Sequence, residues 1–163
     1  MNAIQGLHHN AYRCRDSEST RQFYEDFLGL PLAHAFEINT TKTGRATGVL
    51  HSFYEMGDGS FMAFFEAPGQ PFDFKDQQDF DLHIALEVDE STLHAMFAKG
   101  KAQGIDTRGI ADHGFVQSIY FRDPNGYVIE LTCKIPTDGA VEPGQARAAL
   151  DAWQSSKPGE LLT

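Results

Sequence analysis

The chain is built from two copies of one sequence pattern. The segments HNAYRCRDSEST and HIALEVDESTLH, which begin at His9 and His83, align from their first histidines. In both copies an alternating strand precedes a capped helix, a glycine that ends the helix, and further strands. Such a repeat constrains the fold more than any single element does. The predicted fold class is α+β, with paired βαβββ modules that form a curved mixed sheet around a cavity, because one curved sheet cannot bury both of its faces alone.

The first module is predicted over residues 5–68. Alternation over 7–15 predicts a strand that places His9, Ala11 and Arg13 on one face. Asp16 or Ser17 is suited to cap a helix that ends at Gly29. Further strands are expected over 30–36, 49–56 and 60–66, with a polar loop at 39–48.

The second module is predicted over residues 80–134, after a linker at 69–79. It begins with an alternating strand over 82–88, followed by a helix that ends at Gly104 and a strand and loop over 107–115. It closes with a hairpin, because Asp-Pro-Asn-Gly turn residues separate two β-branched and aromatic runs, 119–121 and 127–131. Residues 135–163 form a C-terminal extension outside the repeat, with a short helix expected over 146–153.

Composition excludes several classes of function. The formal charge of −10 argues against a nucleic-acid partner, which requires a basic face. No apolar run is long enough to cross a bilayer, and the N-terminal residues lack the features of a signal peptide. We therefore expect a cytoplasmic protein in which Cys14 and Cys133 are reduced and buried.

Three side chains stand out as candidate metal ligands. Glu130 lies in an apolar strand, where a carboxylate is costly to bury without a positive partner. Exposure on a one-sided sheet is the ordinary explanation for such a residue. However, His9 and His83 occupy equivalent places in the two copies, and two imidazoles with one carboxylate form the facial triad that holds non-haem Fe(II). A divalent metal would supply the charge that Glu130 requires.

The sequence resembles the vicinal oxygen chelate superfamily, which includes glyoxalase I, bleomycin and fosfomycin resistance proteins and type I extradiol dioxygenases. The resemblance covers residues 5–134 and rests on HHNAYRCRD, FYEDFLGL, LHIALEV and YFRDPNGYVIEL. It implies paired βαβββ modules with a metal in the cavity, and it places the metal ligands at His9, His83 and Glu130. It does not distinguish pairing within one chain from exchange between two chains, and we expect a homodimer.

Among the members, the three-ligand set is most similar to that of extradiol dioxygenases. The resemblance implies that His113 and Tyr120, in HGFVQSIY ahead of Asp123-Pro124, are catalytic. Ala111 and Ser60 depart from that group's pattern. The expected activity is Fe(II)-dependent cleavage of a catechol-like aromatic by O₂, with His113 as acid and base and Tyr120 as a hydrogen-bond donor. Mn, Ni, Zn and Co are the alternative metals.

Two other functions remain open. A glyoxalase-like isomerase or lyase requires a fourth ligand, but the equivalent position holds Ala63, and Glu66 belongs to the opposite face of a regular strand. A binding protein that sequesters an aromatic drug or metabolite would use the thirteen phenylalanines of the chain as cavity walls, and would not need the metal.

Overall fold

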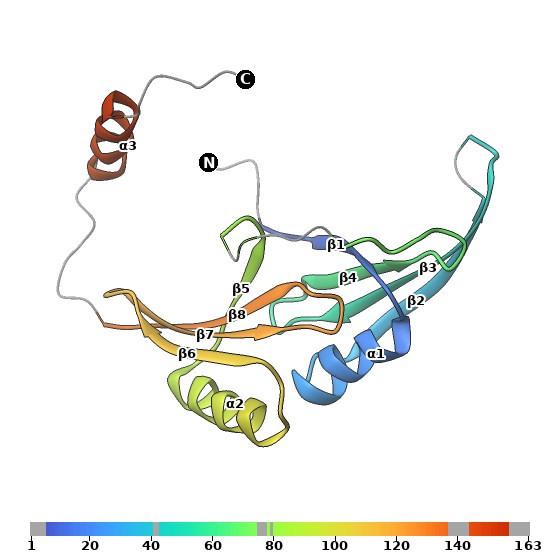
Figure 1. Cartoon of the computed structure of the whole chain (residues 1–163), viewed down its shortest axis with the longest axis horizontal. Coiled ribbons are helices and arrows are strands. Elements are labelled where there is room, and N and C mark those ends of the chain that lie inside the picture. The colour runs from blue at the N-terminus through green and yellow to red at the C-terminus, as the bar shows by residue number, and fades with distance from the viewer. Residues whose placement is uncertain (1–5, 41–42, 75–77, 79, 137–143, 157–163) are drawn as a thin grey trace.

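The computed structural model describes residues 6–40, 43–74, 78, 80–136 and 144–156, and it contains two four-stranded mixed sheets (Figure 1). The first sheet has the order β1-β4-β3-β2 and the second has the order β5-β8-β7-β6. In each sheet the first and last strands of the module pair in parallel, and the remaining pairs are antiparallel. The strands are β1 (His9–Cys14), β2 (Leu32–Thr40), β3 (Ala46–Glu55), β4 (Phe61–Glu66), β5 (His83–Glu87), β6 (Thr107–Asp112), β7 (Val116–Arg122) and β8 (Val128–Lys134).

The registers of the two sheets confirm the repeat residue by residue. Ala11 of β1 lies opposite Ala63 of β4, and at the same place in the second sheet Ala85 of β5 lies opposite Glu130 of β8. His9 and His83 each occupy the first position of their strands. The paired-module α+β fold that the repeat predicted is therefore present.

Each module carries a helix after its first strand. The first is α1 (Ser17–Arg21), which continues as the π-helical segment η1 (Gln22–Phe27), and the second is α2 (Glu90–Ala102). Aspartates cap both helices as the sequence indicates, because Asp16 accepts a hydrogen bond from the Ser19 amide and Asp89 accepts one from the Thr92 amide. Gly29 follows the first helix with a φ of 84°, a conformation that few other residues adopt.

The two helices lie on the same side of the sheets (Figure 1). Alternate side chains of each strand face this helix layer, and Tyr54 and Phe64 pack there against Tyr24, with ring centroids 5.5 and 4.6 Å from it. We call the opposite side of each sheet its open face. His9, Ala11, His83 and Ala85 belong to the open faces, and all four are exposed.

Packing on the helix side joins the modules into one core. The phenyl rings of Phe27 and Phe121, from different modules, meet edge to face at 5.1 Å. The buried Tyr24 hydroxyl donates to Asp123 Oδ2 at 3.0 Å, and the Tyr127 hydroxyl donates to the Arg13 carbonyl at 2.8 Å. The turn of the β7–β8 hairpin therefore anchors the second module to the first.

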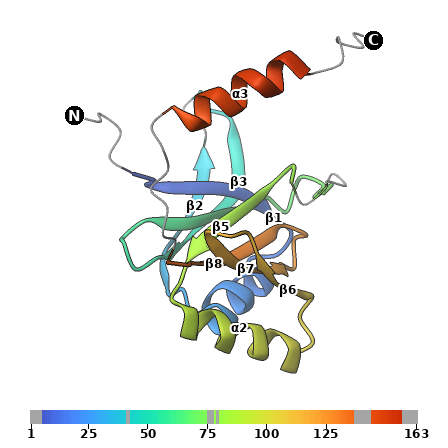
Figure 2. The ribbon, with the colours of Figure 1, turned by 90° about the vertical axis from the view of Figure 1, so that its left-hand side faces the viewer.

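The C-terminal extension contains the predicted helix, α3 (Gln145–Ser156). It stands clear of both sheets (Figure 2), and Leu150 and Trp153 are exposed on it. No helix in the described part of the chain has the length and apolarity needed to cross a membrane.

One loop is shorter than predicted. Residues 39–48 were expected to form a polar loop, but β2 extends to Thr40 and β3 begins at Ala46, so antiparallel pairing continues into this segment.

Candidate metal and acid–base site

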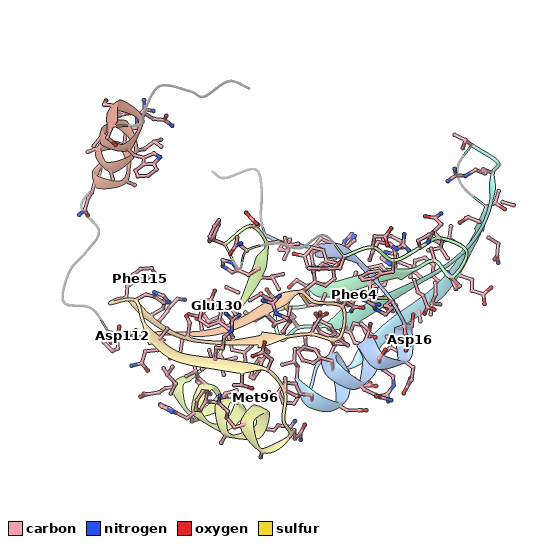
Figure 3. All side chains as sticks on the ribbon, viewed as in Figure 1. Asp16, Phe64, Met96, Asp112, Phe115 and Glu130 are labelled. Carbon is pink, nitrogen blue, oxygen red and sulfur yellow. The ribbon has the colours of Figure 1, made fainter. Side chains whose placement is uncertain are left out.

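The open face of the second sheet brings four of the five predicted site residues together. Tyr120 of β7 lies directly opposite Glu130 of β8, because the turn between the two strands, 123–127, contains five residues. His83 reaches Glu130 from the neighbouring strand, with His83 Nε2 3.3 Å from Glu130 Oε2. His113 Nε2 lies 3.0 Å from the Tyr120 hydroxyl. The result is a continuous row, His83–Glu130–Tyr120–His113, across three strands and a loop. Figure 3 labels one member of this row, Glu130 of β8.

Glu130 and His83 differ in how far their side chains are exposed to solvent. The Glu130 side chain is only 11% exposed, whereas that of His83 is 41% exposed. A half-open imidazole beside a buried carboxylate is an arrangement that suits a metal ligand pair, because the carboxylate needs a positive partner and the imidazole keeps access to the cavity.

The Tyr120 hydroxyl lies between the carboxylate and the second imidazole. Burial raises the pKa of Tyr120, and the neighbouring Glu130 charge raises it further, so the phenol remains protonated at neutral pH. The imidazole tautomer decides whether the Tyr120 hydroxyl or His113 Nε2 donates the hydrogen bond between them. This pair can therefore donate to, or accept from, a molecule bound beside Glu130.

The fifth predicted residue, His9, is not part of the row. Its ring contacts His8, His51 and Phe53 on the open face of the first sheet. The Arg13 end of β1 approaches the start of β8, and His9 lies four residues, or about 13 Å, further along the strand. The first residues of β1 and β5 accordingly lie far apart in Figure 2. Within the described residues, no three His, Cys, Asp or Glu side chains converge as a metal site.

Other candidate residues have structural roles. Glu66 faces the helix side, where its Oε2 accepts a hydrogen bond from the Ser17 amide at 2.8 Å, as strand parity predicted. Arg13 donates to the side chain and backbone of Gln70 at 3.4 and 3.5 Å. His8 lies just before β1, with its Nδ1 2.8 Å from that of His9.

A cleft of about 740 Å³ lies between the modules on the helix side of β5. Its walls are largely apolar, and they include Leu28, Met56, Ile84 and Met96. None of the five predicted site residues lines it, so we do not assign the chemistry to this cleft.

Sequence reasoning did not single out His51 as a site residue, because it has no partner in the repeat. The structure places it on the open face of the first sheet, 6% exposed, with its ring stacked on Phe65 at 3.7 Å. The alternation of His51 with Phe53, and of Phe61 with Phe65, was the available signal.

Comparison with known proteins identifies the family. A sequence model of the Glyoxalase/Bleomycin resistance protein/Dioxygenase superfamily matches residues 6–131, and the chain belongs to this superfamily. The metallothiol transferase FosB of Shouchella clausii (strain KSM-K16) is 26% identical over 134 residues, which span 78% of this chain and 80% of the relative.

Solved structures show the same fold. A glyoxylase/bleomycin resistance protein/dioxygenase domain from Frankia sp. EAN1pec superposes with a TM-score of 0.67 at 16% identity, over 82% of this chain and all of that one. The fosfomycin resistance protein FosX from Listeria monocytogenes, solved with Mn(II) and sulfate, gives a TM-score of 0.60 at 19% identity, over 81% and 94% of the two chains.

Proposed function

We propose that the protein is a metal-dependent enzyme that opens a catechol-like aromatic ring with O₂. The observation that carries the proposal is the His83–Glu130–Tyr120–His113 row, in which a metal ligand pair lies next to an acid–base pair. Membership of a superfamily that includes dioxygenases supports it. Glyoxalase-like chemistry lacks its fourth ligand here, because Glu66 faces the helix side. Metal-free sequestration would not need the row.

In this proposal His83 and Glu130 hold the metal, and His9 of a second copy of the chain completes the triad. The donor set fits, since two imidazoles and one carboxylate leave coordination positions open. A second copy is needed because His9 and His83 of one chain lie on separate open faces. A bound Fe(II) ion would supply the positive charge that attracts a catecholate and the reactivity toward O₂.

The chain's own residues carry the proton transfers. His113 accepts the proton from one substrate hydroxyl, and Tyr120, which is held as a neutral phenol, donates a hydrogen bond to the other oxygen. In the overall reaction both atoms of O₂ enter the product. The carbon–carbon bond next to the two hydroxyl-bearing carbons breaks, and a carbonyl group and a carboxylic acid form.

The test is anaerobic loading with Fe(II), followed by O₂ uptake and absorbance measurements on a panel of catechols. We expect uptake coupled to a coloured ring-opened product, a large loss of turnover in Tyr120→Phe and His113→Gln, and retention of metal in both variants. O₂ uptake that is absent with every catechol, or unaffected in both variants, contradicts the proposal. Phe80→Leu, at an exposed side chain that is not a member of the row, is the control.

A second candidate is metal-dependent transfer of a thiol to a small molecule, since the FosB relative is named a metallothiol transferase. Arg108 lies opposite Tyr120 in the sheet, and its positive charge acts to lower the pKa of Tyr120. This cation beside the row would suit an anionic substrate. Consumption of L-cysteine with fosfomycin and Mn(II) tests this candidate. Thiol loss without O₂ uptake would favour it over ring cleavage.

A further inference from the structure

The open face of the first sheet is covered by aromatic rings. Phe53 is at their centre, with ring centroids of Phe36, His51 and Phe61 at 5.8, 4.2 and 5.9 Å. These residues come from three adjacent strands, and register places them on one face. We call Phe36, His51, Phe53, Phe61 and Phe65 the aromatic platform.

The aromatic platform lies outside the hydrophobic core of the first module. The helix side of the same sheet already contains the buried aromatic residues Tyr24, Tyr54 and Phe64. On the open face, by contrast, Phe36 is 49% exposed. Large apolar side chains that gather on an exposed face indicate a binding surface.

His51 gives the platform a defined polarity. Its Nδ1 lies 2.9 Å from the Phe64 carbonyl oxygen, which can only accept, so Nδ1 carries the proton in the neutral imidazole. Nε2 is then a hydrogen-bond acceptor, and the hydrogen bond that His51 makes among the described residues uses Nδ1. An acceptor set among phenyl rings matches a flat ligand that carries a hydroxyl donor.

We propose that the aromatic platform binds a planar hydroxylated aromatic ring, which packs against Phe53 and Phe36 and donates its hydroxyl to His51 Nε2. Aromatic rings pair in offset or edge-to-face geometry, and five rings on one face offer such contacts to a flat ligand. This binding role rests on the proposed ring-opening function, for which the platform would recognise the aromatic ring. Binding to the platform does not require the metal, so ligand binding and ring cleavage can be tested separately.

The experiment measures binding of 2-naphthol and 2-methoxynaphthalene to the full-length, metal-free protein by ligand fluorescence. Methylation removes the hydroxyl donor and keeps the ring. We expect 2-naphthol to bind more tightly, and His51→Leu to weaken it about three- to tenfold while leaving 2-methoxynaphthalene nearly unchanged. His51→Gln, which retains an acceptor, should recover part of the affinity for 2-naphthol.

Phe53→Leu should weaken both ligands, because it removes the ring at the centre of the platform, and Phe80→Leu should change neither. Circular dichroism melts verify that each variant is folded. Equal losses for the two ligands in His51→Leu would overturn the role of His51. Wild-type protein that binds neither ligand would overturn the platform itself. So would a Phe53→Leu variant that binds both ligands as tightly as the wild type, even if it dissociates into monomers.

Discussion

Ala63 and Glu130 occupy equivalent positions in the two modules, and in the proposed site this single difference limits the number of metal ligands. Ala63 lies on the last strand of the first module, opposite Ala11, and Glu130 lies on the last strand of the second module, opposite Ala85. Ala63 is fully buried beneath the aromatic platform, whereas Glu130 reaches His83. A carboxylate at residue 63 would provide the fourth ligand that isomerases of this superfamily use.

Ala63→Glu should therefore reduce both stability and turnover. The new carboxylate would be buried among aromatic rings, which costs about 1–3 kcal/mol or more without a partner. Added Ni(II) should restore part of that loss if the carboxylate reaches the metal. Thermal melts with and without Ni(II), together with O₂ uptake, measure both effects. Ala11→Glu, at an exposed site on the same face, is the matched control for stability.

A variant as stable as wild type, with unchanged turnover, would show that residue 63 does not face the metal.

Asp123 is a buried carboxylate whose ionisation opposes folding. Burial raises its pKa above 3.8, although the Asn125 side chain, the Tyr127 amide and the Tyr24 hydroxyl donate to it and lower the pKa in part. A raised pKa means that the folded protein binds the proton more tightly than the unfolded chain does. This contribution to stability is complete below about pH 3.8 and is lost as the pH rises through the folded pKa.

The wild type should accordingly lose stability relative to Asp123→Asn as the pH rises from about 3.5 to 7. Urea denaturation at several pH values measures it. A difference that moves in favour of the wild type with rising pH would mean that the hydrogen bonds, rather than burial, set the pKa.

At the level of elements, helix α2 lies unusually close to the second sheet at Gly100. A β-carbon at this position would lie 2.7 Å from the Phe121 ring and would also meet the Thr107 side chain. Glycine in a helix normally costs about 1 kcal/mol relative to alanine. The close contact with the sheet, and not helix propensity, therefore explains a glycine at residue 100.

Gly100→Ala should for this reason destabilise the protein by about 1–3 kcal/mol, opposite to the effect of alanine in an exposed helix. Chemical denaturation measures the change. The control is Ala98→Gly on the exposed part of the same helix, where propensity alone predicts a loss of about 1 kcal/mol. Stabilisation by Gly100→Ala would mean that the helix can move away from the sheet at little cost.

The β7–β8 hairpin, which local chemistry sets, was predicted from the sequence, whereas the arrangement set by packing between modules was left open. The β7–β8 hairpin follows from Asp-Pro-Asn-Gly, and the five-residue turn then fixes Tyr120 opposite Glu130. The separation of His9 from His83 depends on how the modules pack, which no short pattern encodes. The platform residue His51 was missed because the second module has Ser118 at the equivalent position, so the repeat gave no signal.

At the scale of the whole molecule, a site shared between two chains predicts complementation. His9→Leu and Glu130→Gln should each abolish metal binding alone. When the two variants are co-refolded, half of the dimers combine one chain of each kind, and one of their two sites is intact. Bound metal should then recover to about a quarter of the wild-type amount, measured by elemental analysis after gel filtration.

The control mixture is His83→Leu with Glu130→Gln, in which both changes lie in the second module. No heterodimer of that pair has an intact site, so it should stay empty. Equal metal content in the two mixtures would exclude a shared site.

The anchoring of the β7–β8 turn on the first module also affects how the protein is made. Asp123 and Tyr127 provide hydrogen-bond partners for Tyr24 and the Arg13 carbonyl, yet they follow them by about a hundred residues. During synthesis the first module leaves the ribosome long before these partners exist, although domains commonly begin to fold from the N-terminus. The hydrogen bonds of the Tyr24 hydroxyl and the Arg13 carbonyl can therefore form only after most of the chain has been translated, and the first module leaves the ribosome without these partners.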